Sequence, residues 1–339
     1  MTDIDIERRD SLAAYLGERG WTVTDFQVLS GGVSNKTVWA RIEGQPGNGW
    51  VIKQCLEKLR VQADWFTSPD RLHVEALALQ RMPSLLLRRQ VPQFIFEDES
   101  AHILAMQAVE MPHLTLKQYL LRGSVDANHI AEFALMLAML HAKTAADLPA
   151  WEADFSNRSF YETLRLEAYY SFAAENVPAA AHFLHRLIDD TRAHRLAVVH
   201  GDYSPKNVII TSHGLVLLDY EVMHIGDPTF DIGFAMTHLL SKAHHLPDAR
   251  PALLAAASQF ASQVLMASSP LSDTPGYESR AVRQTLGCLM ARVAGRSPLE
   301  YLSDAEKTRQ REMTLALMAD APATFTGLVT RFEGMLRDA

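Results

Sequence analysis

The chain contains the stretch His200-Gly201-Asp202-Tyr203-Ser204-Pro205-Lys206-Asn207, and twelve residues after its end comes Asp219-Tyr220-Glu221. Short apolar runs flank both motifs: Ala197-Val198-Val199, Val208-Ile209-Ile210 and Leu215-Val216-Leu217-Leu218. Runs of this kind predict buried strands, and Ser212-His213-Gly214 between the last two predicts a tight turn. The sequence therefore predicts a polar loop, a hairpin, and then a carboxylate at a strand end.

Acidic residues at two separate places suit phosphoryl transfer from ATP. That reaction needs one carboxylate that orients and deprotonates an attacking hydroxyl, and further groups that hold the Mg²⁺ bridging the phosphates. Asp202 can fill the first role, and Asn207 with Asp219 the second. His200 is an alternative base, but we favour a structural hydrogen-bonding role for it because Asp202 already occupies the position that the chemistry needs.

In these motifs the chain resembles the aminoglycoside phosphotransferase and choline kinase family, which has a protein-kinase-like fold. The first motif resembles that family's H-G-D-x-x-x-x-N loop, and Asp219-Tyr220-Glu221 resembles its D-x-E motif. The resemblance implies that Asp202 is the catalytic base and that Asn207 and Asp219 bind Mg²⁺. Glu221 is a candidate for a further ligand.

The segment Ile225-Gly226-Asp227-Pro228-Thr229-Phe230-Asp231 resembles the G-D-P-x-x-D segment of the same family. The resemblance implies that Asp231 accepts hydrogen bonds from the catalytic loop backbone and fixes its shape. Asp227 either does the same or faces substrate. Lys206 either offsets charge on the transferring phosphoryl group or is a solvated loop residue, and the sequence does not separate these alternatives.

The amino-terminal third supplies candidates for the nucleotide site. Leu29-Ser30-Gly31-Gly32-Val33-Ser34-Asn35-Lys36 resembles the family's phosphate-covering loop, in which Gly31, Gly32, Ser34 and Asn35 would border the phosphates. Lys53, in a strand similar to the kinase V-x-I-K strand, would contact the α- and β-phosphates. Glu75, which lies among apolar residues of the next helix, is its expected partner; the alternative for Glu75 is a surface pair with Arg71.

The segment 102–109 resembles the strand and hinge that bind adenine through backbone groups. By that resemblance the Gln107 carbonyl and the Val109 N–H face the base. Backbone recognition leaves little side-chain signal, so an ordinary buried strand is the alternative.

We expect an α+β, bilobal protein-kinase-like fold. Residues 1–109 form a small β-rich lobe with one helix, and residues 110–339 form a larger, mainly helical lobe with the catalytic loop and the acceptor pocket. The β-type segments expected in the first lobe are 21–29, 37–42, 50–55, 93–97 and 102–108. The helices expected in the second are 126–146, 159–176, 178–195, 229–245, 251–267, 277–293, 303–318 and 322–337.

Composition limits the functional classes. The formal net charge is −8, and no basic patch is evident, so we expect neither a nucleic acid nor a membrane surface as partner. The two cysteines, Cys55 and Cys288, lack metal-ligand spacing and are expected to be reduced thiols. The amino terminus carries no apolar signal segment, which predicts a cytoplasmic protein.

Together these features predict an ATP- and Mg²⁺-dependent kinase that moves the γ-phosphoryl group to a hydroxyl of a small metabolite, such as a sugar, an amino alcohol or an aminoglycoside-like compound. The spacing from Asp219 to Asp231 leaves no room for a protein-kinase activation segment. The alternatives are a protein or peptide kinase with the same cleft, and a nucleotide-binding pseudokinase scaffold. The acceptor, a preference for ATP over GTP and the oligomeric state are left open.

Overall fold

A computed structural model describes residues 4–29, 34–60 and 65–337. It divides into two compact units, a sheet unit and a helical unit. The sheet unit consists of Met1–His113 and Val216–Glu221, and the helical unit of Leu114–Leu215 and Val222–Ala339. The segment with Asp219 therefore belongs to the same unit as Lys53. The lobe boundary at 109 stays a prediction.

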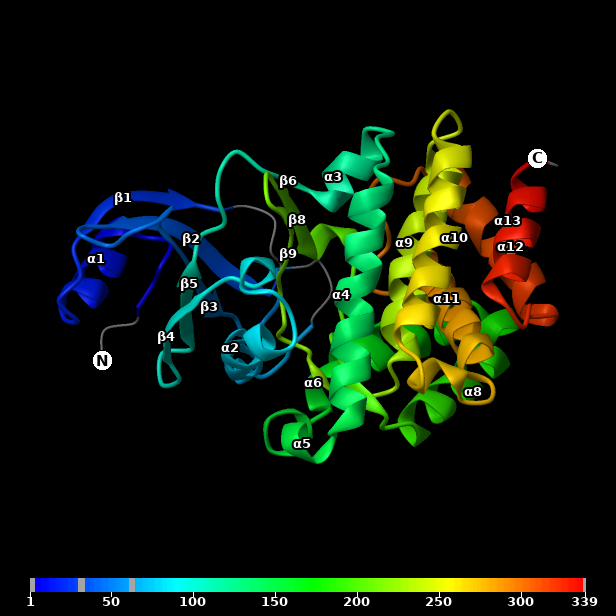
Figure 1. Cartoon of the computed structure of the whole chain (residues 1–339), viewed down its shortest axis with the longest axis horizontal. Coiled ribbons are helices and arrows are strands. Elements are labelled where there is room, and N and C mark those ends of the chain that lie inside the picture. Colours follow the sequence, from blue (N-terminus) through cyan, green and yellow to red (C-terminus); the bar gives the residue numbers. More distant parts are fainter. Residues whose placement is uncertain (1–3, 30–33, 61–64, 338–339) are drawn as a thin grey trace. The chain divides into compact units, whose positions relative to one another are not determined.

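The sheet unit is built on a five-stranded antiparallel sheet of order β1-β2-β3-β5-β4 (Figure 1). Its strands are β1 (Val23–Val28), β2 (Asn35–Ile42), β3 (Trp50–Cys55), β4 (Phe94–Asp98) and β5 (Ile103–Gln107). The helical segments are α1 (Arg9–Gly17), α2 (Arg71–Arg81) and the 3₁₀ turns η1 (Met82–Ser84) and η2 (Arg88–Gln90). All five strands lie within or next to the segments expected from alternating apolar residues.

Aromatic residues build the core on one face of this sheet. Trp50 of β3 is buried, and the ring of Trp21 stands edge-on to it at 5.0 Å. Trp21 also stacks on Phe96 of β4 with 4.9 Å between ring centroids. Leu12 and Leu16 from α1 belong to the same buried cluster. This packing fixes the strand register, because a shift by one residue would turn every apolar side chain to the other face.

The helical unit carries most of the helices. They are α3 (Leu116–Leu121), α4 (Ala127–Ala146), α5 (Pro149–Phe155), α6 (Ser159–Tyr161), α7 (Phe172–Asn176), α8 (Pro178–Ala193), α9 (Thr229–His245), α10 (Arg250–Ala267), α11 (Tyr277–Ala294), α12 (Asp304–Ala319) and α13 (Phe325–Arg337). The 3₁₀ turns are η4 (Pro205–Asn207) and η5 (Leu271–Asp273). Caps set two of the helix starts: Asp126 accepts the N–H of Asn128 before α4, and Ser303 and Glu306 form a capping box before α12.

Short strands hold the loops of the motifs. Strand β7 (Ala197–Val199) pairs antiparallel with β10 (His224–Gly226). The sheet β6-β8-β9 consists of β6 (Leu114–Thr115), β8 (Val208–Thr211) and β9 (Gly214–Leu217). Within β9 the chain passes from the helical unit into the sheet unit. The predicted strands around both motifs are therefore present.

The expected helix over 159–176 differs in detail. Its central part, Glu162–Ser171, is a π-helix (η3) between the short helices α6 and α7. Hydrophobic spacing predicts helix but does not distinguish a π-helical from an α-helical segment. Such segments are uncommon and frequently occur at functional sites.

The centre of the helical unit is a layer in which α10 lies against both α4 and α9, and α11 packs against α9 (Figure 1). Gly233 permits the close approach of α9 and α11. A Cβ atom at this position would lie 2.6 Å from the backbone nitrogen of Thr285 and 2.7 Å from the carbonyl carbon of Gln284. None of the helices in the described part of the chain combines the length and apolar character needed to cross a membrane.

We predict that Gly233→Ala destabilises the protein by about 1–3 kcal/mol, because α11 backbone atoms would have to move. The matched control is Gly334→Ala in α13, where a Cβ would meet nothing within 4 Å. That change should stabilise by about 0.5–1 kcal/mol through helix propensity. Denaturant unfolding of both variants measures the difference, and equal midpoints would show that the α9–α11 contact tolerates a methyl group.

Acid should destabilise the helical unit through His224. Its ring is buried, stacks on Tyr161 with centroids 4.1 Å apart, and bonds the Val222 carbonyl through Nδ1. Burial lowers its pKa from 6.5 to about 3. Because the folded pKa lies below the unfolded one, this contribution is complete above pH 6.5 and is lost as pH falls towards 3.

We therefore predict that His224→Phe flattens the pH dependence of unfolding free energy between pH 6.5 and 3, measured by denaturant titration. The exposed His182 provides the control: His182→Phe should leave the slope unchanged. An unchanged slope for His224→Phe would mean that other groups govern acid unfolding.

Candidate active site

The predicted ion pair between Lys53 and Glu75 is present in the sheet unit. Lys53 Nζ of β3 lies 2.7 and 2.9 Å from the two carboxylate oxygens of Glu75 in α2. It also donates to Oδ1 of Asp219 at 3.1 Å. The Glu75 side chain is almost completely buried, so the surface pair with Arg71 that the sequence left open is not formed. One ammonium thus connects a helix, a strand and the end of β9.

Charge in this cluster favours a bound cation. Burial opposes the charge of Lys53, but Glu75, Asp219 and Glu221 outweigh it and raise the pKa of the ammonium. Burial raises the pKa of Glu75 to about 7, against the opposing effect of Lys53. In the described part of this unit, three carboxylates, Glu75, Asp219 and Glu221, contact the two cations Lys53 and Arg71. Oxygen ligands with a surplus of negative charge are the donor set that Mg²⁺ prefers, so Asp219 suits the ion expected with ATP.

Asp219 has an unusual backbone. Its φ of 69° is in the left-handed region, which few residues other than glycine adopt. Asp is among the residues that tolerate this conformation best. Outliers of this kind cluster at functional sites, where surrounding contacts maintain them.

Glu221 and Asn35 join a buried brace around Arg71, which the sequence analysis did not identify as a site residue. Arg71 is fully buried, and its Nε lies 3.2 Å from Oε2 of Glu221. The Asn35 amide donates to the same oxygen at 3.0 Å. Arg71 also donates to the carbonyls of Ser34 and Leu56. The role of Glu221 as a metal ligand stays a prediction, and these contacts show it already engaged in holding β2 to α2.

The remaining nucleotide candidates are less constrained. Gly31 and Gly32 lie outside the described residues. Gln107 ends β5 and donates through its side chain to the Gly49 carbonyl at 2.9 Å. The N–H of Ala108 reaches the same carbonyl, and Val109 follows it, partly exposed. Adenine recognition by Gln107 and Val109 therefore remains a prediction.

In the helical unit, Asp202 lies buried among donors. Its Oδ2 accepts the Asn207 amide at 2.8 Å and lies 3.0 Å from Lys206 Nζ. Its Oδ1 lies 3.2 Å from a guanidinium nitrogen of Arg165. The Asn207 amide nitrogen also donates to the Asp202 carbonyl, so this bond closes the loop on itself. The sequence left open whether Lys206 offsets charge on the phosphoryl group or is a solvated loop residue. Its side chain is half exposed but paired with Asp202, so it lies next to the candidate base.

The shape of this loop depends on Asp231, as the sequence predicts. Its two carboxylate oxygens accept the N–H groups of His200 at 2.7 Å and Gly201 at 2.8 Å. His141 Nε2 of α4 lies 3.1 Å from the same carboxylate, and all of these side chains are buried. His200 Nδ1 accepts the N–H of Asp202 at 3.2 Å, which supports a structural role for this histidine.

Gly201 meets a second requirement of the loop. Its φ is 76°, and a Cβ there would lie 2.9 Å from the Val222 carbonyl oxygen. Asp227 accepts the N–H of Thr229, the first residue of α9, and lies 3.3 Å from Arg280, so its carboxylate is engaged within the protein.

Arg165 is a site residue that the sequence analysis missed. It lies in the π-helix η3 and, besides the contact with Asp202, donates through Nε to the Gly201 carbonyl at 2.6 Å. A single arginine in an amphipathic helical segment carries no pattern that separates it from a solvated residue. Its position depends on packing between segments distant in sequence.

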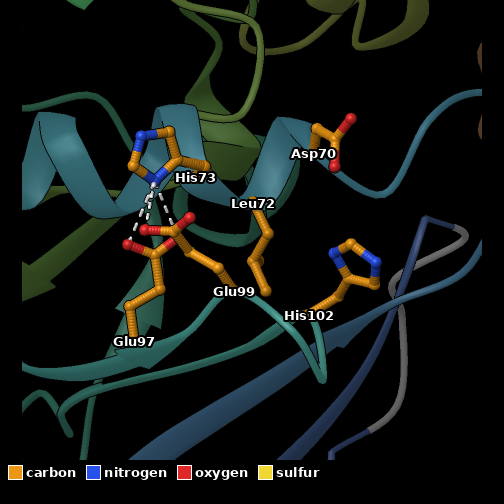
Figure 2. Close-up of a pocket in the computed structure, with 6 residues that line it drawn as sticks. All are labelled: Asp70, Leu72, His73, Glu97, Glu99 and His102. Carbon is orange, nitrogen blue, oxygen red and sulfur yellow. Dashed lines mark hydrogen bonds and ion pairs between the residues drawn. The ribbon is translucent and has the colours of Figure 1, made fainter.

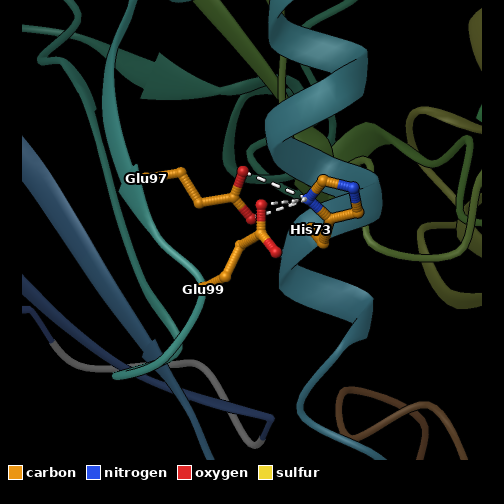
Figure 3. A group of neighbouring side chains, drawn as sticks. All are labelled: His73, Glu97 and Glu99. Atoms are coloured by element: carbon orange, nitrogen blue, oxygen red, sulfur yellow. Dashed lines mark hydrogen bonds and ion pairs between the residues drawn. The ribbon is translucent and has the colours of Figure 1, made fainter.

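A further group of polar side chains lies in the sheet unit, in a pocket of about 160 Å³ lined by Asp70, Leu72, His73, Glu97, Glu99 and His102 (Figure 2). His73 of α2 points toward Glu97 and Glu99 (Figure 3), and its Nδ1 lies 3.0 Å from Glu97. Burial raises the pKa of Glu97. The pocket contains none of the predicted site residues, and a hydrogen bond between α2 and β4 accounts for the group.

Comparison with known proteins agrees with the motifs. A family model described as the phosphotransferase enzyme family matches residues 25–268. Methylthioribose kinase 2 of Oryza sativa subsp. japonica is 23% identical over 262 residues. The match covers 69% of this chain and 60% of that protein.

Solved structures give the same fold. An amicoumacin kinase, 11% identical, has a TM-score of 0.58, with 94% of this chain and 98% of that chain covered. A fructosamine-3-kinase-like protein from Thermobifida fusca YX-ER1, 19% identical, has a TM-score of 0.54, with 93% and 100% covered. A choline/ethanolamine kinase family protein from Mesorhizobium loti, 13% identical, has a TM-score of 0.53, with 98% and 99% covered. The predicted fold class is thereby confirmed, and the match to residues 25–268 shows that this chain belongs to the phosphotransferase enzyme family.

Proposed function

We propose that this protein transfers the γ-phosphoryl group of ATP to a hydroxyl of a small metabolite. The observation that carries the proposal is the position of the Lys53 ammonium, 2.7 Å from Glu75 and 3.1 Å from Asp219. A lysine held by carboxylates from a helix and from a strand end is the group that a kinase uses to bind nucleotide phosphates. The sequence relative named methylthioribose kinase supports a small hydroxylated acceptor.

The residues of the helical unit suit the acceptor side of the reaction. Asp202 would orient the acceptor hydroxyl and take its proton as the oxygen attacks phosphorus. Because Arg165 and Lys206 stabilise the ionised form of this carboxylate, it would work mainly by orientation, with the proton leaving late in a loose transition state. Asn207 and Asp219 remain the proposed ligands of Mg²⁺, which neutralises charge on the phosphates when bound.

The neighbouring loop contacts have a defined task in this proposal. Asp231 fixes the backbone of His200 and Gly201, and the next residue is Asp202. A displacement of about 1 Å in a reacting group can cost about 10²-fold in rate. Asp231 is therefore a positioning residue. The cytoplasmic location stays a prediction, and so does the expectation that neither a nucleic acid nor a membrane is a partner.

The first test is magnesium-dependent ADP release from ATP over a panel of sugars, amino alcohols, nucleosides and aminoglycosides. We expect Asp202→Asn to lower the rate about 10²- to 10⁴-fold while ATP binding persists. Asp304→Asn is the matched control, since that carboxylate lies on the surface of α12. Full activity of the Asp202→Asn variant would show that Asp202 takes no part in the reaction. In a separate experiment, we expect Lys53→Met to lose ATP binding.

Asp231→Asn provides a test of positioning. An amide nitrogen cannot accept hydrogen bonds, so at least one loop N–H loses its partner, at a cost of about 1–3 kcal/mol. We expect kcat to fall about 10²-fold with the KM for ATP nearly unchanged. Rate and melting temperature measured together decide the matter: a variant that is destabilised but catalytically normal would show that Asp231 serves stability alone.

A further inference from the structure

Within the described part of the chain, one lysine in the core of the helical unit lacks a carboxylate partner. Lys242 of α9 is fully buried, and its ammonium donates to the His238 carbonyl at 3.2 Å and lies 5.2 Å from the centre of the Tyr301 ring. Among the described residues, no acidic side chain forms an ion pair with it. Burying a charge without a counter-ion is costly. Folding alone therefore gives no reason for an ammonium at this position.

Arg292 of α11 is a second buried cation, and its hydrogen-bond partners among the described residues are neutral. Its Nη1 atom donates to the Tyr169 hydroxyl at 3.2 Å and to the carbonyl and hydroxyl of Ser297 at 2.5 and 2.9 Å. Its Nε is buried without a hydrogen-bond partner. The bonds to Ser297 explain one nitrogen as a support for the chain after α11. They leave the charge and the Nε donor unexplained.

Aromatic contacts connect these cations to the candidate base. The guanidinium carbon of Arg292 lies 5.7 Å from the centre of the Tyr169 ring, and that of Arg165 lies 5.4 Å from it. Arg165 in turn contacts Asp202 at 3.2 Å. The ring of Phe234 lies 5.9 Å from Tyr169 and 5.0 Å from His238, one helical turn before Lys242. The cluster therefore extends from the catalytic loop into the layer of α9 and α11.

The cluster has an excess of positive charge. Five cations contribute to it: Lys117, Arg165, Lys206, Lys242 and Arg292. Among the described residues, the carboxylates in direct contact with these cations are Asp202, beside Arg165 and Lys206, and Glu300, paired with Lys117. Burial, together with Lys117 and Arg292 and against the opposing effect of Glu300, lowers the pKa of Lys242 to about 7. Burial and four of these cations likewise lower the pKa of His238.

We propose that this buried cationic cluster recognises an anionic group, a carboxylate or a phosphate, on the hydroxylated acceptor. This inference rests on the proposed phosphotransferase function and names its substrate class. Arg292 supplies a buried Nε donor that lacks a partner among the described residues, and Arg165 is a cation next to the carboxylate that would orient the reacting hydroxyl. Lys242, in the core next to this group, adds to the positive electrostatic potential at the proposed site. An anion would supply the counter-charge that the described residues do not provide.

Matched acceptors test the proposal directly. The panel pairs each neutral polyol with its acid and its phosphate ester: glycerol with glycerate and glycerol phosphate, and glucose with gluconate and glucose 6-phosphate. Magnesium-dependent ADP release gives kcat/KM for each. We expect a charged member to exceed its neutral partner by about tenfold to a hundredfold, the value of hydrogen bonds to a charged group. The acid and ester arms distinguish carboxylate from phosphate, and neutral acceptors as the better substrates would overturn the proposal.

Two variants and a control assign the effect to the cluster. Arg292→Gln should remove the preference for charged acceptors while the KM for ATP stays unchanged, whereas Arg311→Gln, on the exposed surface of α12, should retain it. Lys242→Met provides the safeguard against a folding defect. It removes a buried charge, so the melting temperature should hold or rise while the affinity for the anion falls. If both variants behave like Arg311→Gln, the cluster does not bind the acceptor.

Binding measured without turnover separates this inference from the proposed function. Calorimetric titration of the intact protein with glycerate, gluconate and the two phosphate esters needs no phosphoryl transfer. Binding of these anions that Arg292→Gln weakens about tenfold or more would support the cluster even if no acceptor is phosphorylated. Transfer to neutral acceptors together with no anion binding would keep the kinase reaction and reject the anion site.

Discussion

The helical unit depends on the carboxylate of Asp231. It accepts two consecutive N–H groups, from His200 and Gly201, and contacts His141 of α4. Since buried N–H groups without partners are costly, this carboxylate ties the start of α9 to the loop after β7. Gly201 makes the turn possible, because its φ of 76° and its distance to the Val222 carbonyl admit no Cβ. Asp202 is consequently the next residue of a backbone that has little freedom to move.

In the sheet unit, ion pairs hold the candidate site residues in place. Lys53 contacts Glu75 and Asp219, while Arg71 contacts Glu221. Each cation holds a carboxylate from the segment after β9 against the helix α2. Buried ion pairs of this kind contribute little net stability compared with apolar packing, but breaking one is costly. They are therefore better explained by the geometry that they impose on Asp219 than by the free energy of folding.

Much of this arrangement could be predicted from sequence, for reasons that are local. Asp202, Asn207 and Asp219 stand at fixed spacing beside apolar runs, and Glu75 lies among apolar residues where a charge needs a partner. The hydrogen bonds of Asp231 followed from the resemblance of the segment that contains it. Arg71, Arg165 and Lys242 could not be found in this way. Arg71 reaches Ser34 and Glu221, 37 and 150 residues away, and Arg165 reaches Gly201, 36 residues away. The Lys242 ammonium donates to a carbonyl of its own helix, and no short motif records contacts of these kinds.

The local balance of charge differs between the two units and from the net charge of the chain. The chain carries −8 overall, and its sheet unit places three carboxylates around two cations, a surplus that suits Mg²⁺. The helical unit differs near Asp202, where two cations, Arg165 and Lys206, contact one carboxylate among the described residues. The charge of the ligand that a site binds depends on the electrostatic potential within a few ångströms, because water and salt screen more distant surface charges. A buried ion pair accounts for its own charges, whereas Lys242 is buried without a carboxylate partner among the described residues, and the proposed anion would supply that counter-charge.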